Sequence, residues 1–392
     1  MATGREFDVI IYGSTGYTGR LVAEYVAKTY GVGGDLKWAM AGRSADKLAA
    51  VRDEIGAPAD TPFVVADAND PASLKSMVER AGCICTTVGP YQLYGEALVA
   101  ACAEAGTDYV DLCGEPAWMH QMIDKYEGAA QASGARIVFS CGFDSIPFDL
   151  GVWFTQEAAK ERFGAPVPRI KGRVRKMQGT FSGGTAASFK ATMASVGKDP
   201  SILGVLQNPF SLTMGFQGPD QPHGMKPIED TDIGSWSAPF IMASINTKNV
   251  HRSTALMGHA YGEDFTYDEM MLTGPGEQGK AAAEAVANMD MMGGDDGPKP
   301  GEGPSKEERE AGFYDVMFYG TSADGKVIVA GVTGDKDPGY GSTSKMIAES
   351  AICLVKDDTG TPGGVWTPAP AMGGHIVKRL TEKAGLTFTV EN

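Results

Sequence analysis

The chain has 392 residues, 43% of them hydrophobic, and a formal net charge of −15. This length and apolar content favour two domains, each with its own core. The acidic excess repels phosphate backbones and no basic run is interleaved with aromatic residues, so we expect no nucleic-acid partner.

Targeting signals and metal motifs are not found in the sequence. The apolar stretches, such as residues 9–12 and 137–139, have strand length and fall far short of the roughly 20 residues of a membrane span. The N-terminus lacks the basic start and apolar core of a secretory signal. The six cysteines form no CxxC pair and the five histidines have no ligand-like spacing, which favours free thiols and no metal. We therefore expect a cytoplasmic protein, with peripheral membrane contact left open.

Strand and helix patterns alternate through the first 150 residues, which is typical of a parallel sheet covered by helices on both faces. Asp70 followed by Pro71 is a helix cap with a first-turn proline, and it predicts a helix ending near residue 81. The other predicted elements are two helices, over 17–30 and 97–105, and strands over 7–12, 37–41, 62–66, 83–88, 109–112 and 136–139. The fold class predicted is α/β, with a Rossmann-type doubly wound sheet over residues 1–150.

The alternation ends near Gly151, which predicts a second, mixed α/β domain over 151–335. Residues 289–303, rich in Gly, Met, Asp and Pro, are typical of a mobile loop. Strand patterns over 313–318 and 326–330 flank Asp324-Gly325 and predict a hairpin, and residues 344–354 predict a helix.

A glycine-rich turn follows the first predicted strand and opens the first predicted helix. In this setting Gly13 allows the tight turn, Gly16 lets the backbone approach a pyrophosphate and Gly19 permits close packing of helix on strand. A purely structural strand-to-helix turn is the alternative. The predicted cofactor-binding residues of this turn are Gly13, Ser14, Thr15, Gly16, Tyr17, Thr18 and Gly19.

The end of the second predicted strand carries no carboxylate, where an NAD enzyme places one on the ribose hydroxyls. Arg43 and Ser44 stand there instead, with Lys47 one helical turn further on. They predict a 2′-phosphate site and hence NADP(H), although a solvated arginine at a strand end is the alternative. Asp67, after the third strand, suits either an adenine contact or a helix cap.

Signatures of rival catalytic families are missing from the sequence. There is no GxSxG elbow, and neither GxxxxGK match is followed by the Ser or Thr of a P-loop. No Tyr stands four residues before a Lys, which argues against a short-chain dehydrogenase.

Several further motifs carry a family resemblance that spans nearly the whole chain. They lie at residues 87–91 (TVGPY), 94–96 (YGE), 109–115 (YVDLCGE), 141–147 (CGFDSIP), 182–185 (SGGT), 300–309 (PGEGPSKEER) and 337–341 (DPGYG). The chain resembles the saccharopine dehydrogenase-like oxidoreductases, the group that includes the trans-acting enoyl reductases. The resemblance implies an NADP-binding domain, a second domain of saccharopine-reductase type and a C-terminal helical segment, residues 336–392, that returns to the first domain.

Ligands of a doubly wound sheet lie over the carboxyl ends of its strands, so the loops after strands four to six should face the nicotinamide. This position adds Val88, Gly89 and Pro90 to the predicted cofactor site. A reductase also needs a proton donor for many substrates. The candidates for catalysis are Tyr91, Tyr94, Asp144 and Ser145, each of which has a structural alternative as a lid, turn or cap residue. Ser182, Gly183, Gly184 and Thr185 are expected to form the substrate wall of the second domain.

Two classes of function remain open at this point. The leading hypothesis, which rests on the resemblance, is an NADPH-dependent reductase of a conjugated C=C or a C=N bond. The other is a non-catalytic NADP(H)-binding sensor or scaffold at lipid surfaces. From residue 199 to 247 the only basic residue is Lys226, amid the apolar runs 201–206 and 239–242, which favours an apolar acyl or lipid-like substrate. The alternative is that these runs are ordinary core and that Arg169, Lys190 or Arg252 binds a carboxylate. Self-association is possible but has no sequence signal.

Overall fold

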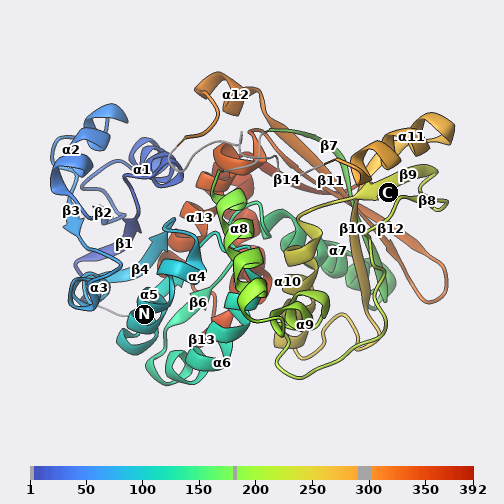
Figure 1. Cartoon of the computed structure of the whole chain (residues 1–392), viewed down its shortest axis with the longest axis horizontal. Coiled ribbons are helices and arrows are strands. Elements are labelled where there is room, and N and C mark those ends of the chain that lie inside the picture. The colour runs from blue at the N-terminus through green and yellow to red at the C-terminus, as the bar shows by residue number, and fades with distance from the viewer. Residues whose placement is uncertain (1–3, 180–182, 290–301) are drawn as a thin grey trace.

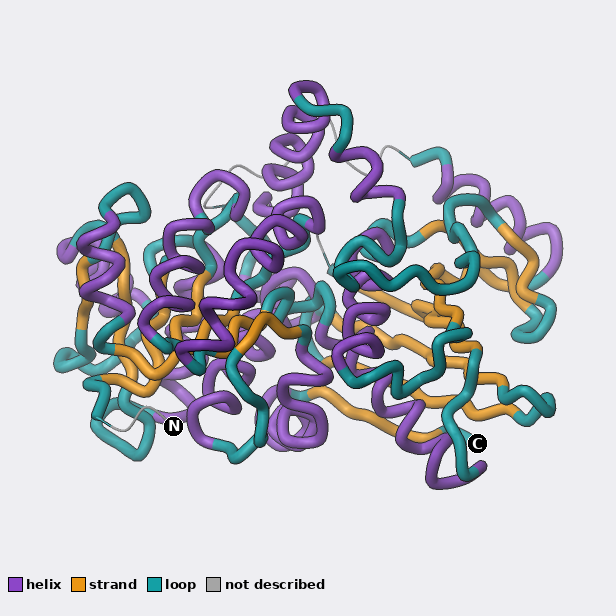
Figure 2. The backbone as a smooth tube through the Cα atoms, turned by 90° about the horizontal axis from the view of Figure 1, so that it is seen from below, coloured by secondary structure: helices purple, strands orange, loops and turns teal. Residues whose placement is uncertain are grey.

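The computed structural model describes residues 4–179, 183–289 and 302–392. Its described residues form two seven-stranded sheets that lie side by side (Figures 1 and 2). The first sheet is parallel throughout and has the order β13-β6-β5-β4-β1-β2-β3. Its strands are β1 (Phe7–Tyr12), β2 (Trp38–Gly42), β3 (Phe63–Val65), β4 (Ala81–Thr86), β5 (Asp108–Val110), β6 (Arg136–Val138) and β13 (Gly364–Trp366).

Helices cover both faces of the first sheet, as a doubly wound fold requires. On one face, α1 and α13 pack against each other and against β1. On the other, α5 packs between α3 and α6. The helices are α1 (Tyr17–Tyr30), α2 (Ala45–Glu54), α3 (Pro71–Val78), α4 (Tyr91–Tyr94), α5 (Glu96–Ala105), α6 (Pro116–Ser133) and α13 (Thr343–Lys356). The predicted Rossmann-type fold is confirmed.

The second sheet is mixed and has the order β14-β12-β11-β7-β10-β9-β8. Only β7 and β10 pair in parallel among its described strands, and the predicted hairpin is present as the antiparallel pair β11 and β12. The strands are β7 (Arg169–Gln178), β8 (Ile228–Asp230), β9 (Ser235–Pro239), β10 (Thr266–Gly274), β11 (Phe313–Thr321), β12 (Val327–Gly334) and β14 (Leu386–Val390).

Helices of the second half pack on this sheet and bridge the two halves. α7 packs on β11 and β12, and α10 packs on α7 and β10. α8 lies between the two halves in the view of Figure 1 and contacts α4 of the first. The helices are α7 (Ile146–Phe163), α8 (Gly183–Lys198), α9 (Ile202–Gln207), α10 (Ala243–Leu256), α11 (Gly276–Ala287), α12 (Lys306–Ala311) and α14 (Pro368–Arg379), with short η segments at Pro338–Ser342 and Leu380–Ala384.

The C-terminal part of the chain belongs to both sheets. α13 packs on β1, β4 and β5, and β13 extends the first sheet by pairing with β6. The last strand, β14, then pairs with β12 in the second sheet. The segment after residue 336 is thus not only helical, and its crossing ties the two halves together.

Two predicted boundaries were wrong where α3 meets β4. The helix ends at Val78 rather than near residue 81, and the strand spans Ala81–Thr86 rather than 83–88. Ala81 pairs with Phe7 of β1, and a Cβ on Gly82 would lie 2.9 Å from the carbonyl oxygen of Asp8. Two small residues that look like a helix end therefore begin the strand, and at Gly82 the approach of the Asp8 carbonyl leaves no room for a side chain.

Candidate functional site

The glycine-rich turn after β1 has the geometry of a pyrophosphate site. Gly13 has a φ of +94°, and a Cβ on Gly19 would lie 2.1 Å from the carbonyl oxygen of Gly13, so both positions require glycine. Gly16 is exposed, and a Cβ there would contact only the Gly13 carbonyl, at 3.3 Å. No side chain in the described part of the chain caps the first turn of α1, which leaves its backbone N–H groups available for an anion.

Of the remaining residues of this turn, some make hydrogen bonds inside the protein and others are exposed. Ser14 is buried and its hydroxyl donates to the carbonyl of Ile11 at 2.7 Å, whereas Thr15 is exposed. Tyr17, the first residue of α1, donates to the carbonyl of Pro304 and accepts a 2.5 Å hydrogen bond from Arg309. The segment before β11 therefore lies against the nucleotide turn.

Arg43 lies at the end of β2 with an exposed guanidinium. Among the described residues it has no hydrogen-bond or ion-pair partner, which suits both the predicted 2′-phosphate contact and the alternative of a solvated arginine. Ser44 is the N-cap of α2 and accepts from the backbone N–H of Lys47 at 3.4 Å. No acidic residue stands between the end of β2 and Asp46, so the strand end itself carries no carboxylate.

Asp67 does not cap α3, because Asp70 does so by accepting from the N–H of Ala72 at 3.1 Å. Asp67 instead accepts from the backbone and side-chain amides of Asn69, at 2.9 and 3.2 Å. The helix-cap alternative for Asp67 is thus wrong, and the adenine contact stays a prediction.

Glu115 holds the loops after β4 and β5 together and reaches α8. Its carboxylate accepts from the backbone N–H groups of Tyr91 and Gln92, both at 2.9 Å, and from the Ser188 hydroxyl at 2.6 Å. Gln92 adds a 3.1 Å hydrogen bond to Thr192 of the same helix. The segment 88–92, with Val88, Gly89 and Pro90, is therefore anchored at the predicted nicotinamide end.

The two candidate tyrosines of this loop differ in their surroundings. The Tyr91 hydroxyl is buried, donates to the Thr86 carbonyl at 3.3 Å and accepts from the Leu112 N–H at 3.0 Å. This geometry favours the structural alternative, a lid over the core, because both hydrogen-bonding directions are used inside the protein. Tyr94 ends α4 with a 44% exposed side chain, and its catalytic role stays a prediction.

Asp144 lies in the loop after β6, and its carboxyl reaches the loop after β5. Its Oδ2 atom would lie 3.4 Å from a Cβ on the exposed Gly114. Burial raises the pKa of Asp144 to about 7. A carboxyl group at this edge of the sheet can thus carry a proton near neutral pH.

Ser145, next to Asp144, is fully buried and is the N-cap residue of α7. Its hydroxyl accepts a 2.8 Å hydrogen bond from the side-chain amide of Asn249 in α10. The predicted catalytic residues Asp144 and Ser145 are therefore adjacent. The hydrogen bond from Asn249 makes Ser145 a link between the two halves of the molecule. Cys141 is buried, with its thiol donating to the Val138 carbonyl at 3.5 Å, as a structural cysteine does.

α10 carries a buried polar face that the sequence did not reveal. Asn246 donates to Glu269 of β10 at 2.8 Å, and Tyr267 donates to the other carboxylate oxygen at 2.9 Å. The sequence of α10 mixes polar residues around the helix, and Glu269 follows Asp268, a pair usually seen at a surface. Only the packing of α10 on β10 makes these groups neighbours.

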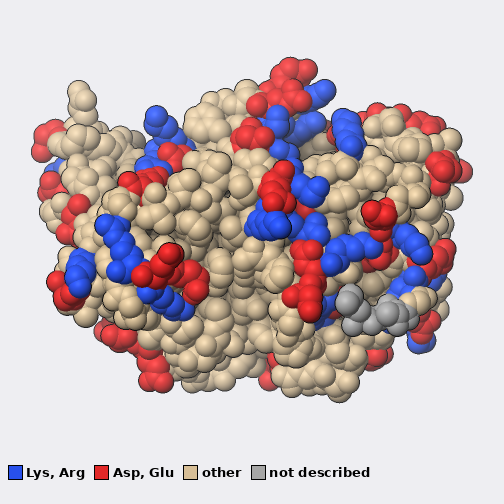
Figure 3. Space-filling view, turned by 180° about the vertical axis from the view of Figure 1, so that it is seen from behind, with Lys and Arg blue, Asp and Glu red and all other residues tan. Residues whose placement is uncertain are grey.

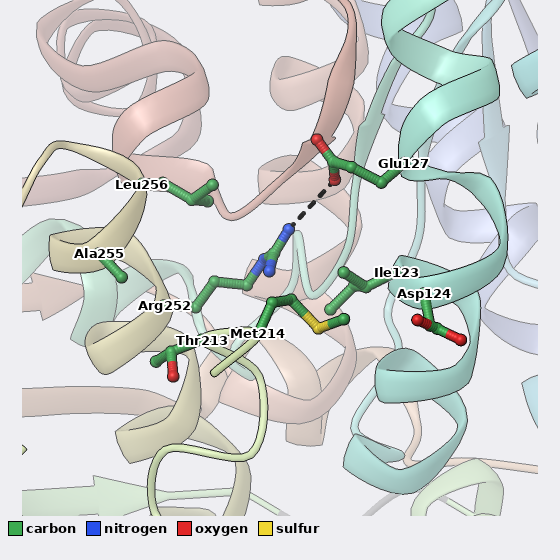
Figure 4. A pocket seen from close by; sticks show the side chains of 8 residues that line it. All are labelled: Ile123, Asp124, Glu127, Thr213, Met214, Arg252, Ala255 and Leu256. Atoms are coloured by element: carbon green, nitrogen blue, oxygen red, sulfur yellow. Dashed lines mark ion pairs between the residues drawn. The ribbon is translucent and has the colours of Figure 1, made fainter. Parts of the chain in front are cut away.

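A pocket of about 320 Å³ lies between α6 and α10, beside Thr213 and Met214 (Figure 4). Arg252 projects toward Glu127 across it, at 3.5 Å, and donates to the carbonyls of Leu212 and Val365. Arg169 likewise pairs with Asp268. Both arginines proposed as carboxylate clamps are therefore engaged by the protein itself.

Parts of two predicted features lie outside the described residues. Of the predicted substrate wall, Ser182 lies outside the described residues, while Gly183, Gly184 and Thr185 form the first turn of α8. Of the predicted mobile loop 289–303, residues 290–301 also lie outside the described residues. Of the apolar runs, Phe240 and Met242 are core residues, whereas no residue of α9 is buried.

Two surface properties bear on partners. On the face seen in Figure 3, basic side chains lie beside acidic ones instead of gathering in a basic patch. Among the described residues, no helix is long and apolar enough to cross a membrane.

The fold and the strand-end site together define an NADP-binding oxidoreductase with a Rossmann-type domain. A family model, the saccharopine dehydrogenase NADP binding domain, matches residues 9–138. A Mycobacterium tuberculosis protein provisionally named a trans-acting enoyl reductase is 41% identical, over 97% of this chain and 96% of its own. A trans-acting enoyl reductase of Mycobacterium ulcerans is 38% identical, over 96% of each chain.

The chain belongs to the saccharopine dehydrogenase-like family, in the group of the trans-acting enoyl reductases. Two solved structures share its fold. Saccharopine dehydrogenase (L-Glu forming) from Saccharomyces cerevisiae has a TM-score of 0.52 at 13% identity, over 98% of this chain and all of the other. Homospermidine synthase from Legionella pneumophila, in complex with NAD, has a TM-score of 0.54 at 10% identity, over 98% and 92%.

Proposed function

We propose that this protein reduces the conjugated C=C bond of an acyl substrate with NADPH. The observation that carries the proposal is the placement of Asp144, a carboxyl with a raised pKa, at the strand edge where a nicotinamide would lie. The names of the relatives, trans-acting enoyl reductases, support this reaction.

The residues of the turn and of β2 suit the cofactor. The N–H groups of the first turn of α1 would hold the pyrophosphate beside Gly16, and Arg43 with Ser44 would hold the 2′-phosphate. NADPH supplies a hydride when bound. The segment from Val88 to Pro90, anchored through Glu115, would form one wall of the nicotinamide site.

Asp144 supplies the proton. Reduction of a conjugated C=C adds a hydride to the β-carbon and a proton to the α-carbon, so both electrons come from NADPH and the proton from the protein. The neutral carboxyl of Asp144 gives this proton and becomes a carboxylate. Ser145, held by Asn249, keeps the Asp144 backbone in place.

The proposed substrate is largely apolar. Two of the candidate carboxylate clamps, Arg169 and Arg252, are used inside the protein. The side chains of α9, such as the exposed Leu203, offer apolar surface near α8 instead. A dicarboxylate would need free cationic partners, because a desolvated carboxylate without one costs several kcal/mol. A cytoplasmic location, contact with a lipid surface and self-association remain predictions of the sequence.

The test is NADPH oxidation against a series of 2-enoyl thioesters of increasing chain length. A parallel series pairs keto acids with amino acids. We expect turnover in the first set, rising with chain length. Turnover confined to the second set would instead identify an imine reductase, and none in either set, with tight NADPH binding, would favour a sensor or scaffold.

A further inference from the structure

Asp144 is half-buried and adjoins, through its chain neighbour Ser145 and through its charge interaction with Glu269, a buried polar cluster that crosses from the first half of the molecule to the second. The cluster comprises Ser145, Asn249 and Asn246 on the way to Glu269 and Tyr267. Glu269 is 1% exposed, yet its carboxylate oxygens accept only from Asn246 and Tyr267 among the described residues. A second carboxyl group is thus enclosed behind the first.

Two hydrogen-bond acceptors in this cluster lack partners within the described ranges. The Oδ1 atoms of Asn246 and Asn249 are buried and accept no hydrogen bond from the described residues. The two residues stand three apart on one face of α10, so their side chains are neighbours. Buried acceptors of this kind are normally satisfied by ordered water.

β7 makes room for Glu269. Gly172 pairs with Glu269 across the parallel strands, and a Cβ at Gly172 would lie 2.7 Å from the Tyr267 hydroxyl and 3.1 Å from Glu269 Cγ. A larger residue at position 172 would displace the carboxyl group. The enclosure is therefore built by three elements, β7, β10 and α10.

We propose that Glu269 is the internal proton reserve of Asp144, to which it passes a proton through water held by Asn246 and Asn249. This inference rests on the proposed function. Asp144 gives its proton to the substrate carbon and becomes a carboxylate. Glu269 then gives its proton to Asp144, which leaves the total charge of the two carboxyl groups unchanged. Glu269 is finally reprotonated from solvent. Glu269 acts through Asp144 and touches no substrate.

The electrostatics of the cluster agree with this order. Burial raises the pKa of Glu269 to about 8. The hydrogen bonds from Asn246 and Tyr267 lower this pKa, and the negative charges of Asp268 and Asp144 raise it. Asp144 thus loses its proton first. The return of a proton from Glu269 to Asp144 is then unfavourable by about tenfold, the difference between pKa values of about 8 and about 7, so reprotonation of Glu269 is what completes the transfer. The other ionisable groups here are Tyr267, beside Arg173 of β7, and Cys113, which faces Asp144 from the loop after β5.

The first experiment needs no substrate. It follows the infrared carboxylic-acid C=O band from pH 5 to 10 in the wild-type protein and in Glu269→Gln, Asp144→Asn and the control Glu277→Gln, an exposed residue of α11. We expect Glu269→Gln to remove a band that titrates near 8. Asp144→Asn should lower the midpoint of that band, whereas Glu269→Gln should leave the midpoint of Asp144 near 7. Two results would overturn the inference. One is a Glu269 that is already ionised at pH 7, and the other is a Glu269 midpoint that Asp144→Asn does not change.

The second experiment uses a 2-enoyl thioester that the wild-type enzyme reduces. Glu269→Gln should leave the first turnover within about threefold and slow the steady state by at least about tenfold, with Glu269→Asp restoring part of it. Equal loss in both phases would assign Glu269 a purely structural role and contradict the relay. If no thioester is reduced, the proposed function fails, while the infrared titration still decides whether the two carboxyls are coupled.

Discussion

The side-chain amide of Asn249 donates a 2.8 Å hydrogen bond to the hydroxyl of Ser145. This contact joins α10, which packs on the second sheet, to the loop after β6 of the first sheet. The residue beside Ser145 is Asp144, so the position of the proposed acid depends on both halves of the molecule.

Arg43→Glu should reverse the preference for NADP(H) over NAD(H). The exposed guanidinium has no partner among the described residues, so the change removes a phosphate contact and not a structural one. A lost charge-assisted hydrogen bond of about 1.5–3 kcal/mol weakens NADPH binding by about 10- to 100-fold. Calorimetric titration measures this, with Lys37→Glu, next to the other end of β2, as the control. Unchanged NADPH affinity in Arg43→Glu would refute the 2′-phosphate assignment.

Gly16→Ala and Gly19→Ala should separate cofactor binding from folding. A Cβ at Gly16 points into open space apart from one contact at 3.3 Å, so the variant should fold normally and bind NADPH weakly. A Cβ at Gly19 would collide with the Gly13 backbone and should cost about 1–3 kcal/mol of stability. Denaturant unfolding and NADPH titration give both readouts. Wild-type NADPH affinity in a folded Gly16→Ala would argue against a pyrophosphate at this turn.

Glu115→Ala should loosen the loop after β4 and free α8. The substitution leaves the N–H groups of Tyr91 and Gln92 and the Ser188 hydroxyl without their acceptor. A buried donor left unpaired costs about 1–3 kcal/mol, which applies in full to the Tyr91 N–H, whereas the Gln92 and Ser188 donors are only half-buried. Hydrogen exchange should therefore rise at residues 91–95 and along α8, with Glu104→Ala, an exposed residue of α5, as the control. Unchanged protection in both segments would show that Glu115 does not anchor them.

Asp144→Asn should lower turnover by about 100-fold while NADPH affinity stays within a few fold, because an amide cannot give up a proton. In the wild-type enzyme the protonated form is the active one, so kcat should fall as the pH rises through about 7. Asp358→Asn, an exposed change after α13, serves as the control. A rate that instead rises with pH through this range would mean that Asp144 acts as a base or not at all.

The cofactor half of the fold was readable from the sequence because its signals are local. The strand Phe7–Tyr12, the glycine turn and the helix Tyr17–Tyr30 are predicted with the bounds that the structure has. Each depends on neighbouring residues, through apolar periodicity and the glycine spacing. The resemblance of motifs such as residues 141–147 then extended the family assignment to the whole chain.

The buried cluster behind Asp144 could not be predicted in the same way. Asn246 and Glu269 are 23 residues apart and meet only because α10 packs on β10. Tyr91 shows the converse, since its position suggested a proton donor and its hydroxyl is instead used by the Thr86 carbonyl and the Leu112 N–H. Chain order places a residue near a site but does not say which way its side chain turns or what encloses it.

The most direct test of the account follows the atoms that NADPH and Asp144 deliver. A 2-enoyl thioester is reduced with NADPH deuterated at the transferred position in ordinary water, and then with unlabelled NADPH in D₂O. We predict deuterium at the β-carbon in the first product and at the α-carbon in the second, with both products nearly absent in Asp144→Asn. Label at any other position, or full product formation by Asp144→Asn, would contradict reduction of a conjugated C=C bond with Asp144 as the acid.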